Sequence, residues 1–252
     1  MPSTYELVVL DIDGTTTASK GDALPSQRVI NAVKEAQKSV HIAVATGRAF
    51  SFAKLVTDAL GLHGPSVFNG GAEIVDVSSG ETLYRELLPI ETVREVIELL
   101  LPFGLDIYAD SDQYSEPIRS PEQVDEPAAK LFIDAIETHR AMQILEELTG
   151  VPGASAHPTT SWTDGDVVDI HVTHEHATKR HGVEKLMAIL GCEKEEVMAI
   201  GDGHNDLPML EAAGFKVAMG NAPPEVKAVA DYIAPSLEDD GVAEAIERFI
   251  LK

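Results

Sequence analysis

Four acidic residues in two short segments are candidates for joint chemistry. They are Asp11 and Asp13, which follow the apolar run at 7–10, and Asp202 and Asp206, which follow the apolar run at 197–200. Two carboxylates that are two residues apart at the end of an extended segment can approach one point, as metal binding or acid–base catalysis requires. Four carboxylates at neighbouring strand ends would repel one another without a cation, and oxygen ligands favour Mg²⁺. We therefore expect these two segments to form a Mg²⁺ site.

Each acidic segment also has a purely structural interpretation. Asp13 before Gly14 is a common turn sequence, in which Asp11 could accept a hydrogen bond from a backbone amide. Asn205 and Asp206 could cap the helix that follows them. The second of these interpretations leaves Asp202 unexplained.

A second set of residues carries groups that suit phosphate oxygens. Thr46, Gly47 and Arg48 follow another apolar run and offer a hydroxyl, a backbone amide and a guanidinium. Lys179 could neutralise both a carboxylate and a bound phosphate, although an isolated lysine more commonly faces solvent. Because several of these segments follow apolar runs, we expect them to converge on one edge of a sheet.

Alternating strands and helices are predicted to position these residues. Short apolar runs indicate buried strands at 7–10, 41–45, 66–76, 197–200 and 216–219. Helical spacing of apolar residues indicates helices at 26–39, 50–60, 182–190 and 207–213. This alternation predicts an α/β fold, with a doubly wound parallel sheet.

The pattern changes between residues 82 and 172. This stretch has a helix at 90–101, a strand at 105–110, a further helix starting near Arg140 and a loop at 151–166. The run at 167–172 alternates apolar and polar residues, which is typical of a half-exposed antiparallel strand. We therefore predict an inserted α+β domain at 82–172, between two parts of one core at 1–81 and 173–252.

Composition limits the partners that the chain could have. Its 252 residues include 19 Lys and Arg against 42 Asp and Glu, a formal net charge of -23, which disfavours binding to nucleic acid or an anionic membrane. The single cysteine, Cys192, has no partner for a disulfide and no second ligand for zinc nearby, as expected in a reducing, cytoplasmic setting. The sequence shows no basic leader and no apolar run of about 20 residues, so we predict neither secretion nor a membrane span.

Two features outside these motifs have alternative interpretations. The spacing of four histidines fits no zinc pattern, so we expect surface residues near the domain junction: His171, His174, His176 and His181. Tyr108 and Trp162 could stack on a sugar or pack within the inserted domain, and we favour packing.

The motifs together resemble those of the haloacid dehalogenase (HAD) superfamily of phosphohydrolases. They are DIDGT at 11–15, ATGR at 45–48, Lys179 and GDGHND at 201–206, in matching order and separation. The closing segment at 218–250 and the inserted domain resemble the Cof-type branch, with its type IIB cap. The resemblance implies a Rossmann-like core, a cap that sets substrate specificity and a Mg²⁺ cofactor.

The resemblance also implies a role for each motif residue. Asp11 would attack phosphorus to form an aspartyl-phosphate, and Asp13 would protonate the leaving oxygen and then activate water. The Asp11 carboxylate, the Asp13 backbone carbonyl and Asp202 would hold Mg²⁺.

The remaining motif residues would bind phosphate or support the site. Four of them would hold the phosphate of the substrate: Thr46, Gly47, Lys179 and Asn205. Asp206 would orient the waters of the metal or Lys179. Arg48 would contact either the substrate or the residues behind it.

A phosphatase that acts on a small phosphorylated metabolite, by default a sugar phosphate, is the function we predict. A phosphomutase is the first alternative, but residues 82–172 hold five basic and eighteen acidic residues, a formal charge of 5 minus 18, or -13, which suits a second phosphate poorly. Asp13 argues against a dehalogenase or an ion pump, whose motifs lack this acid. Asp11 and Asp13 together also disfavour a phospho-ligand binder without turnover.

Overall fold

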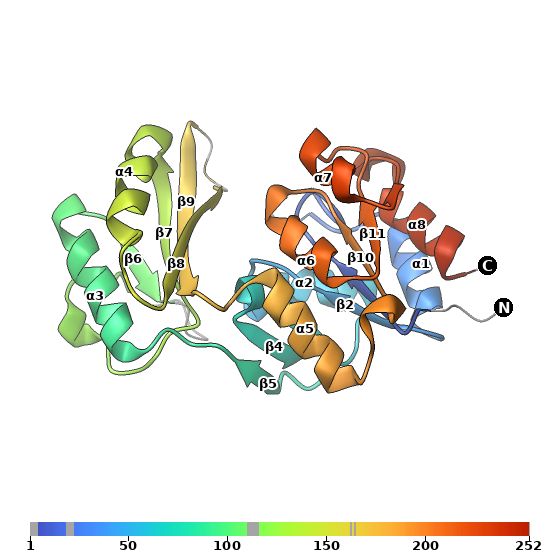
Figure 1. Cartoon of the computed structure of the whole chain (residues 1–252), viewed down its shortest axis with the longest axis horizontal. Helices are drawn as coiled ribbons and strands as arrows, with labels where there is room; N and C mark the ends of the chain where they lie inside the picture. Colours follow the sequence, from blue (N-terminus) through green and yellow to red (C-terminus); the bar gives the residue numbers. More distant parts are fainter. Residues whose placement is uncertain (1–4, 19–22, 110–115, 162, 164, 252) are drawn as a thin grey trace. The chain divides into compact units, whose positions relative to one another are not determined.

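The computed structural model describes residues 5–18, 23–109, 116–161, 163 and 165–251. The chain forms two compact units (Figure 1). The first unit comprises Met1–Tyr84 and Thr178–Lys252, and the second comprises Arg85–Ala177. These junctions lie a few residues C-terminal to those expected from the sequence, at 81/82 and 172/173.

A parallel sheet of five strands forms the centre of the first unit, in the order β12-β11-β10-β1-β2. The strands are β1 (Leu7–Leu10), β2 (His41–Val44), β10 (Val197–Gly201), β11 (Phe215–Ala218) and β12 (Tyr232–Ile233). Strand β1 lies between β10 and β2, with Leu10 opposite both Ile200 and Val44. Strands β10, β11 and β12 lie on one side of β1, and β2 lies on its other side. The order of the strands along the sheet therefore reverses at β1. Ligand sites of open α/β sheets lie at such a point.

Helices cover both faces of this sheet, which confirms the doubly wound prediction. One face packs against α1 (Gln27–Ala36), α2 (Phe50–Leu60) and α8 (Gly241–Phe249), and the other against α5 (Lys179–Leu190), α6 (Leu207–Ala212) and α7 (Pro224–Val229). Because side chains alternate along a strand, Val8 and Leu10 enter the first core while Leu7 and Val9 enter the second. Being buried on both faces explains why β1 is a continuous apolar run.

The single strand predicted at 66–76 is wrong, because two antiparallel strands occupy this stretch. They are β3 (Pro65–Phe68) and β4 (Glu73–Asp76), and β5 (Thr82–Arg85) completes a three-stranded sheet. Asn69, Gly70 and Gly71 all have positive φ angles, which reverse the chain between β3 and β4. A Cβ atom on Gly71 would lie 2.0 Å from the carbonyl oxygen of Thr178, so this close approach requires glycine.

The second unit is an antiparallel sheet in the order β6-β7-β9-β8, with two helices on one face (Figure 1). Its strands are β6 (Ile107–Ala109), β7 (Lys130–Glu137), β8 (Ala154–Thr160) and β9 (Val167–His174). The helices α3 (Ile90–Leu100) and α4 (Thr138–Leu148) pack on apolar side chains of β7 and β9. The antiparallel strand expected at 167–172 is confirmed as β9.

The loop predicted at 151–166 is wrong over the length of β8. Strand β8 lies at the edge of its sheet and pairs with β9 alone, so the missing N–H of Pro158 costs no bond within the sheet. Strand β7 was not predicted. Short 3₁₀ helices complete the described structure, at Asn69–Gly71, Leu101–Phe103, Pro121–Gln123, Lys194–Glu196, His204–Asp206 and Leu237–Asp239.

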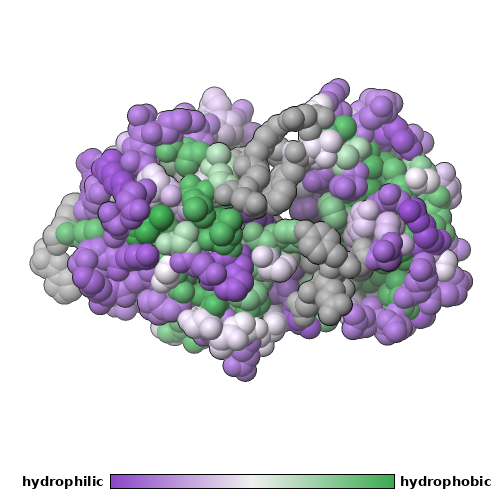
Figure 2. Space-filling model, turned by 180° about the vertical axis from the view of Figure 1, so that it is seen from behind, coloured by the Kyte–Doolittle hydropathy of each residue, from purple (hydrophilic) through white to green (hydrophobic). Residues whose placement is uncertain are grey.

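Hydrophilic residues dominate the face of the molecule shown in Figure 2, with small hydrophobic groups between them. This is the kind of surface that a net charge of -23 predicts. Over the described part of the chain, we find no helix with the length and apolar character needed to cross a membrane.

Candidate active site

Asp11 lies in a buried ion-pair cluster at the carboxyl end of β1. Its side chain is 4% exposed, and the Nζ atom of Lys179 lies 2.5 Å from Asp11 Oδ1 and 2.6 Å from Asp206 Oδ1. Lys179 is the first residue of α5, whose N-cap Thr178 accepts a hydrogen bond from the N–H of His181. The start of this helix therefore places the lysine between two acids rather than in solvent.

The charges of this cluster perturb one another strongly. Burial alone would lower the pKa of Lys179, but the carboxylates of Asp11 and Asp206 raise it above its usual value, so the lysine stays a cation. Burial, and next the Asp206 carboxylate, raise the pKa of Asp11 well above its usual range although Lys179 opposes this. The cluster thus holds more negative charge than one lysine neutralises.

Asp202 follows β10 and faces the loop that follows β1. Its Oδ1 accepts a hydrogen bond of 2.7 Å from the Thr15 hydroxyl. Burial, and to a lesser extent the nearby Asp206, raise its pKa to about 6 against the effect of that hydrogen bond. Gly14 has a φ of 87°, and a Cβ atom there would lie 2.4 Å from Asp202 Oδ2. Glycine is therefore required for this loop to approach Asp202 so closely.

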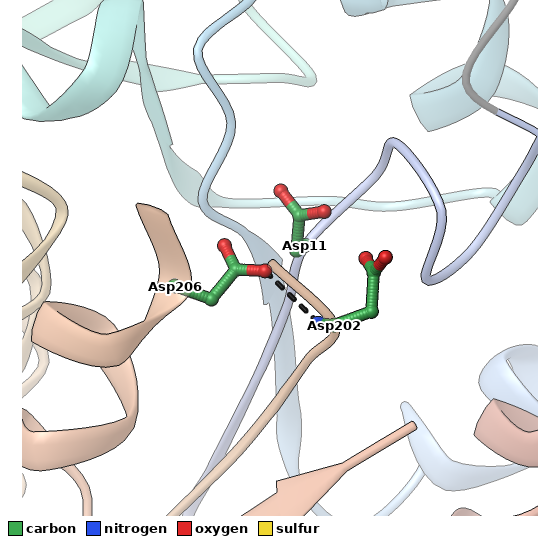
Figure 3. Close-up of side chains that lie close together, drawn as sticks. All are labelled: Asp11, Asp202 and Asp206. Atoms are coloured by element: carbon green, nitrogen blue, oxygen red, sulfur yellow. Dashed lines mark hydrogen bonds between the residues drawn. The ribbon is translucent and has the colours of Figure 1, made fainter. Parts of the chain in front are cut away.

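Three carboxylates form a group that fits a divalent cation. Asp11, Asp202 and Asp206 each offer one oxygen, and these atoms lie within 4.8 Å of one another. Figure 3 shows the Asp11 side chain between those of Asp206 and Asp202 in this view. Hard oxygen donors and raised pKa values of Asp11 and Asp202 fit Mg²⁺, whose charge would relieve the repulsion.

Asp206 already has hydrogen-bond donors on both oxygens. Its Oδ1 contacts Lys179, and its Oδ2 accepts hydrogen bonds from the backbone N–H groups of Asp202 (3.0 Å, Figure 3) and Gly203 (2.9 Å). These contacts fit the expected role of orienting Lys179. With three donors, one of them the Lys179 ammonium, Asp206 is a poorer metal ligand than Asp11 or than Asp202, whose oxygens accept only from neutral side chains among the described contacts.

The Asp13 carboxylate is bound by Arg48 instead of joining that group. Arg48 Nε donates to Asp13 Oδ2 at 3.0 Å, and Arg48 Nη2 donates to Asp13 Oδ1 at 2.5 Å. The sequence analysis left two roles open for Arg48, a contact with the substrate or a contact with the residues behind it. In this structure the contact is with Asp13.

The other expected phosphate ligands lie around the same strand ends. Thr46 is buried, and its hydroxyl oxygen accepts a hydrogen bond from the backbone N–H of Arg48. A Cβ atom on Gly47 would meet no atom within 4 Å, so there is open space beside this glycine. Asn205 is exposed in the 3₁₀ helix that follows Asp202. Phosphate binding by these three residues stays a prediction.

Sequence reasoning missed Asn221, which joins three loops of the site. Its Nδ2 donates to the carbonyl oxygen of Gly14 at 2.9 Å and to Asp202 Oδ2 at 3.2 Å, and its Oδ1 accepts from the N–H of Leu237. Asn221 follows β11 just as Asp202 follows β10. The rule that polar residues after apolar runs meet at one sheet edge could have found it.

Among the residues that the structure describes, the histidines of the second unit do not come together as a group of three metal ligands. Within the described residues, the three aspartates above are the group with ligand atoms close enough for a metal. The expectation of surface histidines fits His176, which is exposed, whereas His171, His174 and His181 are half-buried. His171 lies between the rings of Phe132 and His157. Tyr108 stacks on Phe132, with 5.4 Å between ring centroids, as packing within the inserted domain predicts. Trp162 lies outside the described residues.

Comparison with known proteins decides the family. A profile of haloacid dehalogenase-like hydrolases matches residues 8–116 and 108–246. The chain belongs to this family. It is 31% identical to a phosphoglycolate phosphatase of Methanothermobacter thermautotrophicus over 96% of this chain and 98% of the relative. It is 29% identical to the 5-amino-6-(5-phospho-D-ribitylamino)uracil phosphatase YcsE of Bacillus subtilis, over 98% and 96% of the two chains.

A solved structure supports the same assignment at the level of the fold. The HAD subclass IIB sugar phosphatase BT4131 superposes with a TM-score of 0.77, covering 97% of this chain and 98% of that one at 22% identity. The HAD-type, Cof-like resemblance of the motifs is thereby confirmed. This HAD-like chain is a phosphatase.

Proposed function

We propose that this HAD phosphatase hydrolyses a small phosphomonoester, with Mg²⁺ as cofactor and Asp11 as nucleophile. The observation that carries the proposal is the buried Asp11 carboxylate, with Lys179 on one oxygen and Asp202 beside it. Lys179 fixes Oδ1, so Oδ2 is the candidate attacking atom. A buried, oriented carboxylate suits covalent catalysis.

In the first step, Oδ2 of Asp11 attacks phosphorus and forms a P–O bond. The P–O bond to the leaving group breaks, and its electron pair stays on the leaving oxygen. That oxygen takes the proton of the Asp13 carboxyl group and departs as an alcohol. Asp11 then carries the phosphoryl group, and Asp13 is ionised.

In the second step, the ionised Asp13 takes a proton from water. The water oxygen attacks phosphorus, and the P–O bond to Asp11 breaks with its electron pair returning to the Asp11 carboxylate. Inorganic phosphate leaves, and Asp13 again holds a proton. The two steps together consume one water and regenerate both aspartates.

Residues of the two acidic loops would hold the metal. The carboxylates of Asp11 and Asp202 and the backbone carbonyl of Asp13 are the ligands we propose, with Asp206 keeping Lys179 in place. When bound, Mg²⁺ supplies positive charge that offsets the negative charge of the phosphoryl oxygens. Thr46, Gly47, Lys179 and Asn205 would bind those oxygens.

The substrate that we propose is a small phosphorylated metabolite, with sugar phosphates as the first class to test. The relatives named for phosphoglycolate and for a phosphoribitylamino compound support a small phosphomonoester. The formal charge of -13 over residues 82–172 disfavours the second phosphate that a mutase must hold. We assign residues 82–172 the role of a specificity cap, and a cytoplasmic location to the chain.

Phosphate release from a panel of compounds tests this function. The panel contains sugar phosphates, nucleotides, phosphoglycolate and pyridoxal phosphate, each with Mg²⁺ or EDTA, and Asp11→Asn serves as the blank. We expect release that requires both Mg²⁺ and Asp11. No release from any compound by folded protein that binds Mg²⁺ would contradict the proposal and direct the work to a mutase assay with a hexose bisphosphate.

A further inference from the structure

Arg48 holds both oxygens of the Asp13 carboxylate. Its Nε and Nη2 atoms donate to Oδ2 and Oδ1 at 3.0 and 2.5 Å. Two parallel hydrogen bonds from one planar guanidinium fix the direction of a carboxylate as well as its position. A single contact from a flexible ammonium would leave the carboxylate free to rotate.

Arg48 is itself held firmly. Its side chain is 8% exposed, whereas that of Asp13 is 32% exposed. The backbone N–H of Arg48 donates to the Thr46 hydroxyl oxygen, and its carbonyl accepts from the N–H of Asn69 at 2.9 Å. Arg48 is therefore the firmly held residue of the pair, and it restricts the orientation of the more exposed Asp13 side chain.

The pair also joins two different loops. Asp13 belongs to the loop after β1, and Arg48 to the loop after β2, which are neighbouring parallel strands. A loop carboxylate with this exposure has several rotamers available to it, and proton transfer requires one of them. The contact with Arg48 selects one rotamer.

We propose that Arg48 is a positioning residue, which orients the Asp13 carboxyl group for proton transfer to the leaving oxygen. This inference rests on the proposed function, in which Asp13 is the acid and base. It differs from a role in which Arg48 binds the phosphoryl group of the substrate. The two roles predict different dependences on the leaving group.

An alcohol must receive a proton as it leaves, whereas p-nitrophenolate departs as an anion. Loss of Asp13 orientation therefore slows an alkyl phosphate much more than p-nitrophenyl phosphate. Loss of a phosphoryl ligand slows both substrates alike, because both contain the same phosphoryl group. The ratio kcat/KM reports the first step, in which the leaving group departs.

The experiment compares Arg48→Ala, Arg48→Lys and Asp13→Asn on p-nitrophenyl phosphate and on the best alkyl phosphate of the panel. For Arg48→Ala we expect kcat/KM to fall about a hundredfold on the alkyl phosphate and no more than about threefold on p-nitrophenyl phosphate. Inhibition by inorganic phosphate should be unchanged. Arg48→Lys should recover part of the loss, since it keeps the charge without the two-pronged contact.

A double variant tests whether Arg48 acts through Asp13. In the Asp13→Asn background, Arg48→Ala should cause no further loss on the alkyl phosphate. Arg28→Ala is the matched control, because Arg28 makes a similar two-atom contact with Glu247 at the surface of the same unit. It should leave kcat/KM unchanged on both substrates.

Equal losses on both substrates, with weaker inhibition by inorganic phosphate, would overturn the inference and assign Arg48 to the phosphoryl group. Additive losses in the double variant would overturn it as well. Mg²⁺ binding and thermal unfolding of each variant separate these results from misfolding, and Arg48→Lys provides the test if Arg48→Ala does not fold. Failure of the proposed function gives a different result, namely wild-type protein without activity or Asp13→Asn with full activity on the alkyl phosphate.

Discussion

The two units bury different sets of ionisable side chains, because the second unit holds the buried Lys130 and the half-buried His171. The first unit buries Asp11, Asp206 and Lys179 as charged partners at the strand ends. On the sheet of the second unit, burial, and next Lys130 and His157, lower the pKa of His171 well below its usual value, so this histidine is neutral at pH 7. A charged cluster suits the transfer of a charged phosphoryl group. This difference supports the proposed site in the first unit.

The largest effect that we expect concerns Asp11, the proposed nucleophile. Asp11→Asn should lower phosphate release by about a thousandfold or more, because the amide cannot form the covalent intermediate. Steady-state assays of the best panel substrate measure it. Glu147→Gln, on an exposed position of α4 in the second unit, is the control and should change the rate by less than about twofold. A comparable loss of activity in Glu147→Gln would contradict the conclusion that the rate depends specifically on the acidic cluster of the first unit.

Removal of the buried lysine should destabilise the first unit. Lys179→Met leaves neighbouring buried carboxylates without their cation, and we expect a loss of about 3 kcal/mol in the free energy of unfolding without metal. Urea unfolding at pH 7 measures this loss, and added Mg²⁺ should restore part of it. Lys185→Met, which removes a lysine that lies over the ring of Tyr84, should cost less than about 1 kcal/mol. Equal costs would show that the acidic cluster does not depend on Lys179.

A smaller effect is expected at the residue that joins the loops. Asn221→Ala removes a donor to Asp202 and should weaken Mg²⁺ binding about tenfold, since second-layer contacts orient metal ligands. Titration calorimetry with Mg²⁺ measures the affinity directly. The control Asn31→Ala removes a surface amide on α1 that contacts Gln27. If both variants bind Mg²⁺ like the wild type, Asn221 does not support the metal site.

The smallest effect concerns the neutral histidine of the second unit. Because the pKa of His171 is lowered on folding, the unfolded chain binds its proton first as the pH falls below about 6.5. The stability that neutral His171 contributes is therefore present above that pH and is lost as the pH falls toward the folded pKa. His171→Leu should reduce the loss of stability between pH 7 and pH 5 by about 1 kcal/mol or less.

Urea unfolding curves at pH 5, 6 and 7 test this prediction. Gln143→Leu is the control, because Gln143 is an exposed residue of α4 without an ionisable group, and it should keep the wild-type pH dependence. If the free energy of unfolding of His171→Leu matches that of the wild type at every pH, His171 does not contribute to the pH dependence of stability.

The sequence alone predicted much of the first unit, where short apolar runs and helical spacing are strong signals. Strand β1 and helix α2 lie at the residues expected, because buried parallel strands are uninterrupted apolar runs. The second unit was harder to predict. Strand β8 contains Pro158 and polar residues, which resemble a loop until the pairing with β9 is known.

The sequence by itself determined which side chains stand at the ends of strands, because residue type and period are local properties of the chain. It therefore identified Asp11 and Asp202 as candidates, whereas Lys179, at the start of α5, was a candidate for its charge and its place in the motif pattern. Only the tertiary structure decided that Arg48 holds Asp13 and that Asn221 contacts Asp202. The physical reason is strand order: β1 lies between β10 and β2, and this arrangement sets which loops meet. No local pattern records that order.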